Sequence, residues 1–120
     1  MNKTIFLVDD TDSILTLAAS VLENDYMVLT MMSADKMFSI IEKKKPDLII
    51  LDVEMPDMNG FEALSKLRED PLKNDIPVMF LTGYIDDDIL AKCDALGASG
   101  VMDKNDIKSS LFSKVTELLA

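Results

Sequence analysis

The chain alternates regularly between short apolar runs and longer segments of helical periodicity. The apolar runs have the length of strands, and they cover residues 5–8, 26–31, 48–51, 76–81 and 99–102. After each run, apolar residues recur three or four positions apart, which is the spacing of an amphipathic helix. Five strands that are each followed by a helix require parallel crossover connections, with helices on both faces of the sheet. The sequence therefore predicts a doubly wound α/β fold, in a single domain that spans residues 1–120.

The expected helices carry their own boundary signals. Asp12 or Ser13 is expected to cap the first helix, and Ser33 precedes the second. The third helix must end before Pro71, and Gly97 is placed to end the fourth. A cap side chain accepts a hydrogen bond from a free N–H at the start of a helix. Proline has no N–H to continue the helix, and glycine readily adopts the left-handed conformation that ends one.

Charge and composition exclude several classes of function. With 12 basic and 22 acidic residues, the formal net charge is -10, so nucleic acids and anionic membrane surfaces repel the chain. No apolar run approaches the ~18 residues of a membrane span, and the first eight residues resemble a strand rather than a signal peptide. With no histidine and one cysteine, the chain cannot form a Ser-His-Asp triad, an internal disulfide or a phosphohistidine. We expect a cytoplasmic protein.

Residues suited to bind a ligand, most of them with polar side chains, follow four of the five expected strands. Asp9 and Asp10 follow the first strand, Asp52 and then Glu54 the third, Thr82 and Gly83 the fourth, and Asp103 and Lys104 the fifth. The carboxyl ends of the strands in an open α/β sheet meet at one edge, where such folds bind their ligands. We therefore expect these groups to form one site.

The residue types at this edge favour metal-assisted phosphoryl chemistry. Three converging carboxylates repel one another unless a cation offsets their charge. Oxygen ligands without histidine or cysteine suit Mg²⁺. A lysine and a hydroxyl on the other side could hold phosphoryl oxygens, and an aspartate can itself be the nucleophile. The sequence thus predicts Mg²⁺-dependent phosphoryl transfer to or from a carboxylate.

With these residues assembled, the chain closely resembles the receiver (response-regulator) domain of two-component signalling, of the chemotaxis type. The resemblance covers essentially all 120 residues. It is carried by Phe-Leu-Val-Asp9-Asp10, by Leu-Asp52-Val-Glu-Met-Pro-Asp-Met-Asn-Gly60, by Phe-Leu-Thr82-Gly83, and by Gly97-Ala98-Ser99-Gly100 leading into Lys104. The Asp-x-x-Met-Pro-x-x-x-Gly segment together with the acidic pair is highly specific.

The resemblance implies a flavodoxin-like strand order, 2-1-3-4-5, and a specific set of roles. Asp52 would accept a phosphoryl group from a phosphohistidine of a sensor histidine kinase or histidine phosphotransfer protein. Mg²⁺ would be held by Asp10, Asp52, the backbone carbonyl of Glu54 and, through water, Asp9. Thr82 and Lys104 would contact the phosphoryl group.

The resemblance also implies how phosphorylation would be passed on and ended. The domain would signal to a downstream protein or effector domain through its fourth helix, fifth strand and fifth helix, which could also form a dimer. Slow self-dephosphorylation would end the signal. The domain would be a phosphoacceptor rather than an enzyme, and its own chemistry would be limited to self-phosphorylation from small donors and to self-dephosphorylation.

Two positions depart from the family pattern. Asn105 follows Lys104, where the family usually has a proline after a cis bond; a non-proline cis bond costs ~3 kcal/mol. We therefore expect a trans bond here and an altered placement of Lys104. Val101 occupies the position of the family's switch aromatic, and it has no ring to move inward.

Two other functions remain open from the sequence. Asp10-Thr11-Asp12 superficially matches the Asp-x-Asp of haloacid-dehalogenase-like phosphohydrolases, in which Asp10 would be the nucleophile and Asp52 would have no role. Alternatively, the departures at Val101 and Asn105 would suit a pseudo-receiver that acts as an interaction module without phosphorylation.

Overall fold

A computed structural model describes residues 2–120. Strands and helices alternate along the whole chain, in the order β1 (Thr4–Val8), α1 (Asp12–Leu22), β2 (Met27–Met31), α2 (Ala34–Ile41), β3 (Leu48–Asp52), α3 (Gly60–Glu69), β4 (Val78–Thr82), α4 (Asp87–Ala95), β5 (Gly100–Asp103), a short 3₁₀ helix η1 (Lys104–Asp106) and α5 (Ile107–Leu118). This order matches the five strand–helix pairs that the sequence predicts.

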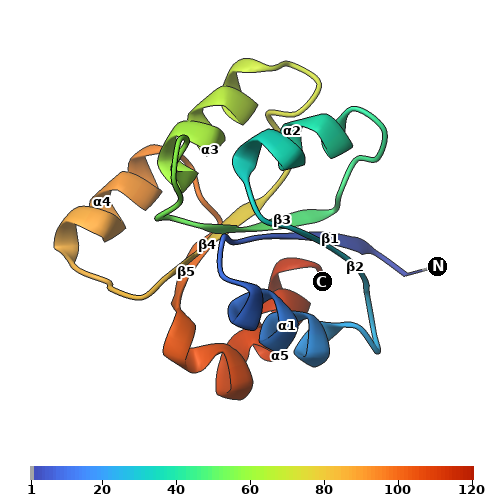
Figure 1. Cartoon of the computed structure of the whole chain (residues 1–120). Coiled ribbons are helices and arrows are strands. Elements are labelled where there is room, and N and C mark those ends of the chain that lie inside the picture. The colour runs from blue at the N-terminus through green and yellow to red at the C-terminus, as the bar shows by residue number, and fades with distance from the viewer. Residues whose placement is uncertain (1) are drawn as a thin grey trace.

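The five strands form one parallel sheet in the order β2-β1-β3-β4-β5. The predicted fold class and strand order are therefore confirmed. Helices α1 and α5 cover one face of the sheet, and α2, α3 and α4 cover the other (Figure 1). Strand β2 lies on one side of β1, and β3, β4 and β5 follow on the other side. The order of the strands therefore switches between β1 and β3, and the carboxyl ends of these two neighbours lie together at the centre of one edge.

Each face of the sheet has its own hydrophobic core. Because successive side chains in a strand point to opposite faces, Ile5 and Leu7 pack toward α1 and α5, whereas Phe6 and Val8 pack toward α2, α3 and α4. The central strand β3 is buried along its whole length, as expected for a strand that is covered on both faces. Cys93 is buried in the core beneath α2, α3 and α4.

Some element boundaries differ from the expected ones. Neither Asp12 nor Ser13 caps α1: the N-cap residue is Thr11, whose side chain makes no capping hydrogen bond. Strand β4 begins at Val78 rather than at residue 76, after Pro77, which has no N–H to donate to the ladder. The predicted start of α2 after Ser33 and the predicted end of α4 before Gly97 are correct. Gly97 has a φ of +72° and ends α4 in a Schellman motif, in which Ala98 N–H donates to the Cys93 carbonyl.

Across residues 2–120, no helix combines the length and apolar character that are needed to cross a bilayer.

Candidate functional site at the carboxyl edge of the sheet

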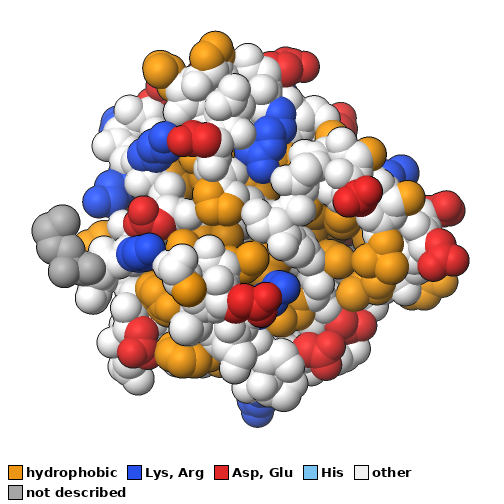
Figure 2. All heavy atoms as spheres, turned by 180° about the vertical axis from the view of Figure 1, so that it is seen from behind, with side chains coloured by type: hydrophobic (Ala, Val, Ile, Leu, Met, Phe, Trp, Pro, Cys, Tyr) orange, Lys and Arg blue, Asp and Glu red, His pale blue; other side chains and the backbone are white. Residues whose placement is uncertain are grey.

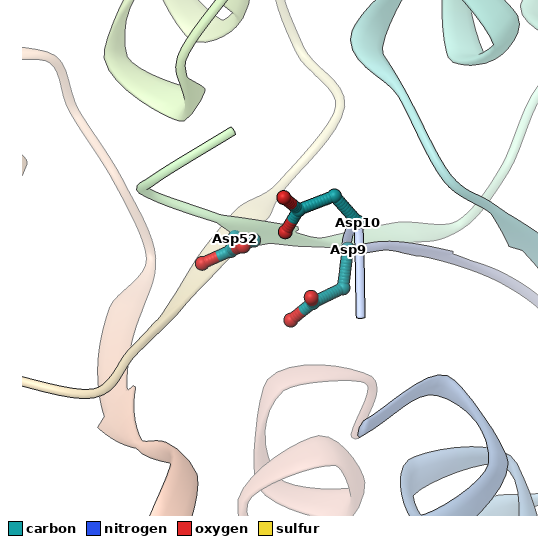
Figure 3. A group of neighbouring side chains, drawn as sticks. All are labelled: Asp9, Asp10 and Asp52. Carbon is teal, nitrogen blue, oxygen red and sulfur yellow. The ribbon is translucent and has the colours of Figure 1, made fainter. Parts of the chain in front are cut away.

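Three carboxylates converge where β1 and β3 end. Oxygen atoms of Asp9, Asp10 and Asp52 all lie within 4.8 Å of one another, and in Figure 3 the three carboxylates gather at the sheet edge, with Asp10 above the strands and Asp9 below them. Asp52 is the last residue of β3, and the other two directly follow β1. The adjacent, parallel pairing of β1 with β3 is what brings residues more than forty positions apart in sequence into one cluster.

The two aspartates after β1 have different environments. Asp9 is buried, and its Oδ1 accepts a hydrogen bond from Thr11 N–H at 2.8 Å, which fixes the carboxylate in the turn before α1. Asp10 is exposed. The site therefore combines one restrained, buried carboxylate with one that solvent can reach.

Lys104 reaches into the cluster from the end of β5. Its Nζ lies 3.0 Å from Asp9 Oδ2 and 3.1 Å from Asp52 Oδ1. All peptide bonds of the described chain, including the one before Asn105, are trans. The trans bond agrees with expectation, and the lysine ammonium nonetheless lies between two of the predicted site residues.

Burial makes Asp52 an unusual carboxylate. Its side chain is 2% exposed, and within residues 2–120 no hydrogen-bond donor contacts its Oδ2. Burial first, and then the nearby charge of Asp9, raise the pKa of Asp52 to about 7, although Lys104 and the Glu54 N–H act in the opposite direction. Burial disfavours the Lys104 ammonium, but hydrogen bonds from the ammonium to Asp9 and Asp52 and their charges outweigh that effect and raise the Lys104 pKa.

Thr82 lies at the end of β4, and its hydroxyl faces its own loop. Thr82 is buried. Its Oγ1 donates a hydrogen bond to the Tyr84 carbonyl at 3.0 Å and accepts one from Tyr84 N–H at 3.2 Å. The structure thus brings the backbone of Thr82 to the predicted edge but engages its hydroxyl with Tyr84. A Cβ added at the intervening Gly83 would meet nothing within 4 Å, so the edge is open there.

Glu54 contributes its backbone to the site, whereas its side chain is exposed. Its N–H donates to Asp52 Oδ1 at 3.3 Å. A groove of about 520 Å³ begins beside Asp10 and Glu54 and continues between the β3–α3 loop and α4, where Phe61, Ile89 and Lys92 line it. The exposed side of the acidic cluster therefore opens into a cleft that a water molecule or a larger group can enter.

The donor set fits a hard divalent cation. All three carboxylates offer oxygen, and the buried Asp52 Oδ2 lacks a protein donor among the described residues. One lysine cannot neutralise three carboxylates, so a further positive charge would relieve their repulsion. Mg²⁺, which prefers a few carboxylates and retains several waters, suits a cluster with one exposed member.

Two contacts around the site are not among the sequence-based predictions. Gly60, the first residue of α3, lies so close to the Asp52 carbonyl that a Cβ at this position would overlap it. Asp103 Oδ1 accepts a hydrogen bond from Asn105 N–H at 2.8 Å, in the turn that contains Lys104. The second contact has a sequence signal, since an aspartate commonly bonds the N–H two residues ahead in turns.

The sequence matches known signalling proteins. A model of the response regulator receiver domain matches residues 5–116. The alkaline phosphatase synthesis transcriptional regulatory protein PhoP of Bacillus subtilis is 41% identical over 83 residues, which are 68% of this chain and 34% of PhoP. The transcriptional regulatory protein YvrH of the same organism is 35% identical over 105 residues, 86% of this chain and 43% of YvrH. The chain thus spans less than half the length of either relative.

Solved structures agree with this match. The chemotaxis protein CheY4 of Vibrio cholerae superimposes with a TM-score of 0.93 at 27% identity, covering 99% of this chain and 100% of that one. The phosphorylated cyanobacterial phytochrome response regulator RcpA superimposes with a TM-score of 0.80 at 26% identity, covering 99% of this chain and 89% of that one. With its fold, its acidic cluster and the matched sequence model, this chain belongs to the receiver-domain family of response regulators in two-component signalling.

Proposed function

We propose that Asp52 accepts a phosphoryl group from a phosphohistidine on a sensor histidine kinase or a histidine phosphotransfer protein. One observation carries this proposal. Asp52 Oδ2 is buried at the end of the central strand without a hydrogen-bond partner among residues 2–120, beside two further carboxylates and a lysine. An oxygen without a protein partner has lone pairs that no other contact uses, and a carboxylate can act as a nucleophile when a neighbouring group or a metal ion activates it.

In the proposed transfer, an Asp52 carboxylate oxygen attacks the phosphorus atom of the donor. A P–O bond forms and the P–N bond to the imidazole breaks; the imidazole nitrogen keeps the bonding electron pair and takes up a proton. Lys104, whose Nζ is 3.1 Å from Asp52 Oδ1, would neutralise charge on the phosphoryl oxygens. The donor histidine must come from another protein, since this chain contains no histidine.

We infer that Mg²⁺ would be held by the Asp10 and Asp52 carboxylates, by the Glu54 backbone carbonyl and, through water, by Asp9. Support comes from the convergence of the three carboxylates and from the exposed position of Glu54, whose side chain is not part of that cluster. When bound, the cation supplies charge neutralisation for the transferred phosphoryl group. It would also favour the ionised form of Asp52, which burial disfavours.

We propose that Thr82 transmits phosphorylation to the β4–α4 loop. A threonine hydroxyl has one proton, and in this structure that proton is donated to the Tyr84 carbonyl. If Thr82 donates to a phosphoryl oxygen instead, the Tyr84 carbonyl loses its partner, and the loop that leads into α4 is free to shift. Phosphorylation would thus favour a second packing of the loop, although Val101 offers no aromatic switch.

The output surface that we propose is formed by α4, β5 and α5. Leu90 on α4 is 45% exposed, Val101 on β5 is partly exposed, and the stem of Lys114 on α5 covers Gly100. The molecule seen from behind carries several separate hydrophobic patches between charged groups, with acidic side chains gathered on the side where α4 lies (Figure 2). A downstream protein, an effector domain or a second copy in a dimer would bind here.

In this proposal the domain is a phosphoacceptor. Its chemistry would be limited to self-phosphorylation from small donors and to slow self-dephosphorylation. Nucleic acid and membrane binding are not part of the proposed role of this segment, because its net charge of -10 opposes both. A cytoplasmic location is proposed on the basis of the donor, because phosphohistidine is formed from ATP.

The test is intact-mass spectrometry of the chain with Mg²⁺ and acetyl phosphate. Wild type should gain the mass of one phosphoryl group, and Asp52→Asn should gain none. Omission of Mg²⁺ should prevent the adduct, and Asp94→Asn on the exposed side of α4 should leave it unchanged. An adduct of equal yield in Asp52→Asn would contradict the proposal.

The same experiment separates the two alternatives. A haloacid-dehalogenase-like hydrolase would carry the adduct on Asp10, but the family match over residues 5–116 favours the receiver. For a pseudo-receiver, no variant should gain mass, either with acetyl phosphate or with a phosphorylated histidine phosphotransfer domain as donor.

A further inference from the structure

We propose that Asp103 is a positioning residue for Lys104, and that it acts through the hydrogen bond its carboxylate accepts from Asn105 N–H. The inference rests on the proposed function, in which Lys104 contacts the phosphoryl group. Neither Asp103 nor Asn105 belongs to the acidic cluster. Their effect on the reaction would therefore be exerted through the backbone on either side of the lysine.

The residue before Lys104 is held firmly by the sheet. Asp103 ends β5 and pairs with Thr82 in the β4–β5 register. Its backbone is thus fixed to β4, the strand next to the one that carries Asp52. The Asp103 backbone has an extended conformation, with φ −72° and ψ 135°, and the chain then turns at once into η1.

The residue after Lys104 is tied back to the same point. Asp103 Oδ1 accepts the Asn105 N–H at 2.8 Å, so the carboxylate closes a small ring around the backbone of Lys104. This is an N-cap of η1, which satisfies an N–H that the first turn of a helix leaves free. Lys104 therefore leaves the strand from a fixed position and in a fixed direction.

The fixed backbone matters because the lysine side chain is long. Several rotatable bonds separate its backbone from Nζ, and their freedom must be lost to hold the ammonium in one place. In the structure that ammonium lies 3.0 Å from Asp9 Oδ2 and 3.1 Å from Asp52 Oδ1. A backbone that moves would spread Nζ over a larger volume and lower the fraction of time it spends between the two carboxylates.

The residue type at position 105 makes this device available, because Asn105 has a backbone N–H to donate. A proline there would have no N–H and could not donate to Asp103. The carboxylate of Asp103 also does not pair directly with the lysine, since the ion pairs of Lys104 within the described chain are those with Asp9 and Asp52. The hydrogen bond, rather than the negative charge of Asp103, is therefore the proposed agent.

Single substitutions separate the hydrogen bond from the charge. We expect Asp103→Ala to slow adduct formation with acetyl phosphate and Mg²⁺ by about 3- to 10-fold, the effect of losing one hydrogen bond. Asp103→Asn keeps an acceptor oxygen and removes the charge, so it should restore the wild-type rate. Asn105→Ala keeps the backbone N–H and should also match wild type. A slow Asp103→Asn, or an Asp103→Ala as fast as wild type, would overturn the proposal.

A double-mutant cycle tests whether Asp103 acts through Lys104. Lys104→Ala alone should slow the reaction strongly, and adding Asp103→Ala to it should change the rate by less than about twofold, because residues that act through one contact are not additive. If Asp103 only supported the fold, its substitution would slow the reaction by the same factor in both backgrounds. Equal factors would therefore contradict the positioning role.

A measurement without phosphorylation keeps this inference distinct from the proposed function. In a ¹⁵N-edited NMR spectrum, an ion-paired lysine ammonium exchanges slowly enough with water to be observed, and Lys104→Ala identifies the signal of Lys104. We expect that signal in wild type and Asp103→Asn, and its loss or broadening in Asp103→Ala. If wild type takes up no phosphate but this pattern holds, the proposed function fails and the positioning role stands. An unchanged Lys104 signal in Asp103→Ala would refute the positioning role by itself.

Discussion

At the scale of single residues, the site depends on a carboxylate held where ionisation is costly. Asp52 ends a strand that is buried on both faces, next to a second buried aspartate, and one lysine compensates the two. Burial and the Asp9 charge outweigh Lys104 and raise the pKa of Asp52 to about 7. In the unfolded chain Asp52 regains its ordinary pKa, so its ionisation couples folding to pH.

This coupling predicts how Asp52→Asn changes stability. Between about pH 4 and pH 7, folded wild type binds more protons at Asp52 than unfolded wild type, so its free energy of unfolding falls as pH rises, and levels off above pH 7. The amide that Asp52→Asn introduces does not titrate. In chelator-containing buffer, Asp52→Asn should match wild type near pH 4 and be more stable by roughly 2–4 kcal/mol at pH 8, since one pKa unit is about 1.4 kcal/mol.

Urea unfolding at several pH values measures this difference. Asp94→Asn on the exposed side of α4 is the control, and its difference from wild type should not follow the same pH dependence. A stability difference between Asp52→Asn and wild type that is constant from pH 4 to pH 8 would show that Asp52 is not held in a costly ionised state.

At the scale of elements, periodicity predicts strands and helices well and their ends less well. The alternation of apolar runs with helical spacing correctly predicts all five strands and the helix after each. It does so because the side chains that a strand or a helix buries recur at the period of that element. The predicted cap of α1 is wrong because the Thr11 carbonyl already accepts the N–H groups of Ile14 and Leu15, so that the helix includes Asp12 and Thr11 is its N-cap. The turn around Lys104 depends on a side chain–backbone bond, which leaves no mark in hydrophobic spacing.

The approach of α3 to β3 yields a prediction at this scale. Glycine at the start of a helix is ordinarily less favourable than alanine, yet at Gly60 an added Cβ would overlap the Asp52 carbonyl oxygen and press on the Phe80 ring. We expect Gly60→Ala to lower the free energy of unfolding by about 1–3 kcal/mol, as over-packing does, and to slow phosphate uptake by displacing Asp52. Thermal unfolding and the intact-mass assay report the two effects.

Gly83→Ala is the matched control for Gly60→Ala. It introduces the same methyl group at the same edge of the sheet, where nothing lies within 4 Å of the added atom. Its stability should stay within about 0.5 kcal/mol of wild type, as for surface substitutions in general. A Gly60→Ala variant as stable as Gly83→Ala would mean that α3 can move away from the site at little cost.

At the scale of the whole molecule, folding brings three carboxylates close together, and a bound cation would reduce the repulsion between them. A cation that binds the folded chain and not the unfolded one stabilises it by an amount that grows with concentration, about 2.7 kcal/mol at a hundredfold excess over Kd. We expect Mg²⁺ to raise the melting temperature of wild type by several degrees. Asp10→Asn should reduce the shift and Asp52→Asn should abolish it, whereas Asp94→Asn should keep it. Equal shifts in all four proteins would place the cation elsewhere.

The whole molecule is also the scale at which the sequence is most informative. The strand order brings residues 9, 10, 52 and 104 together, and the rule that parallel strands bind ligands at their carboxyl ends predicts this convergence from sequence alone. Sequence does not predict the state of each group: the Thr82 hydroxyl is bonded to Tyr84, and Lys104 already occupies the acidic cluster. The state of Thr82 depends on a hydrogen bond within one turn of the chain, and that of Lys104 on ion pairs with residues distant in sequence; neither leaves a mark in the hydrophobic pattern.

The central claim is that Asp52, and no other carboxylate, carries the phosphoryl group. Borohydride reduces an acyl phosphate to the corresponding alcohol, so treatment of the chain after incubation with acetyl phosphate and Mg²⁺ converts the phosphorylated aspartate into homoserine. Tandem mass spectrometry of the peptides then locates that residue. We predict homoserine at position 52 alone, and none without Mg²⁺. Homoserine at position 10, or at several exposed aspartates, would contradict the claim.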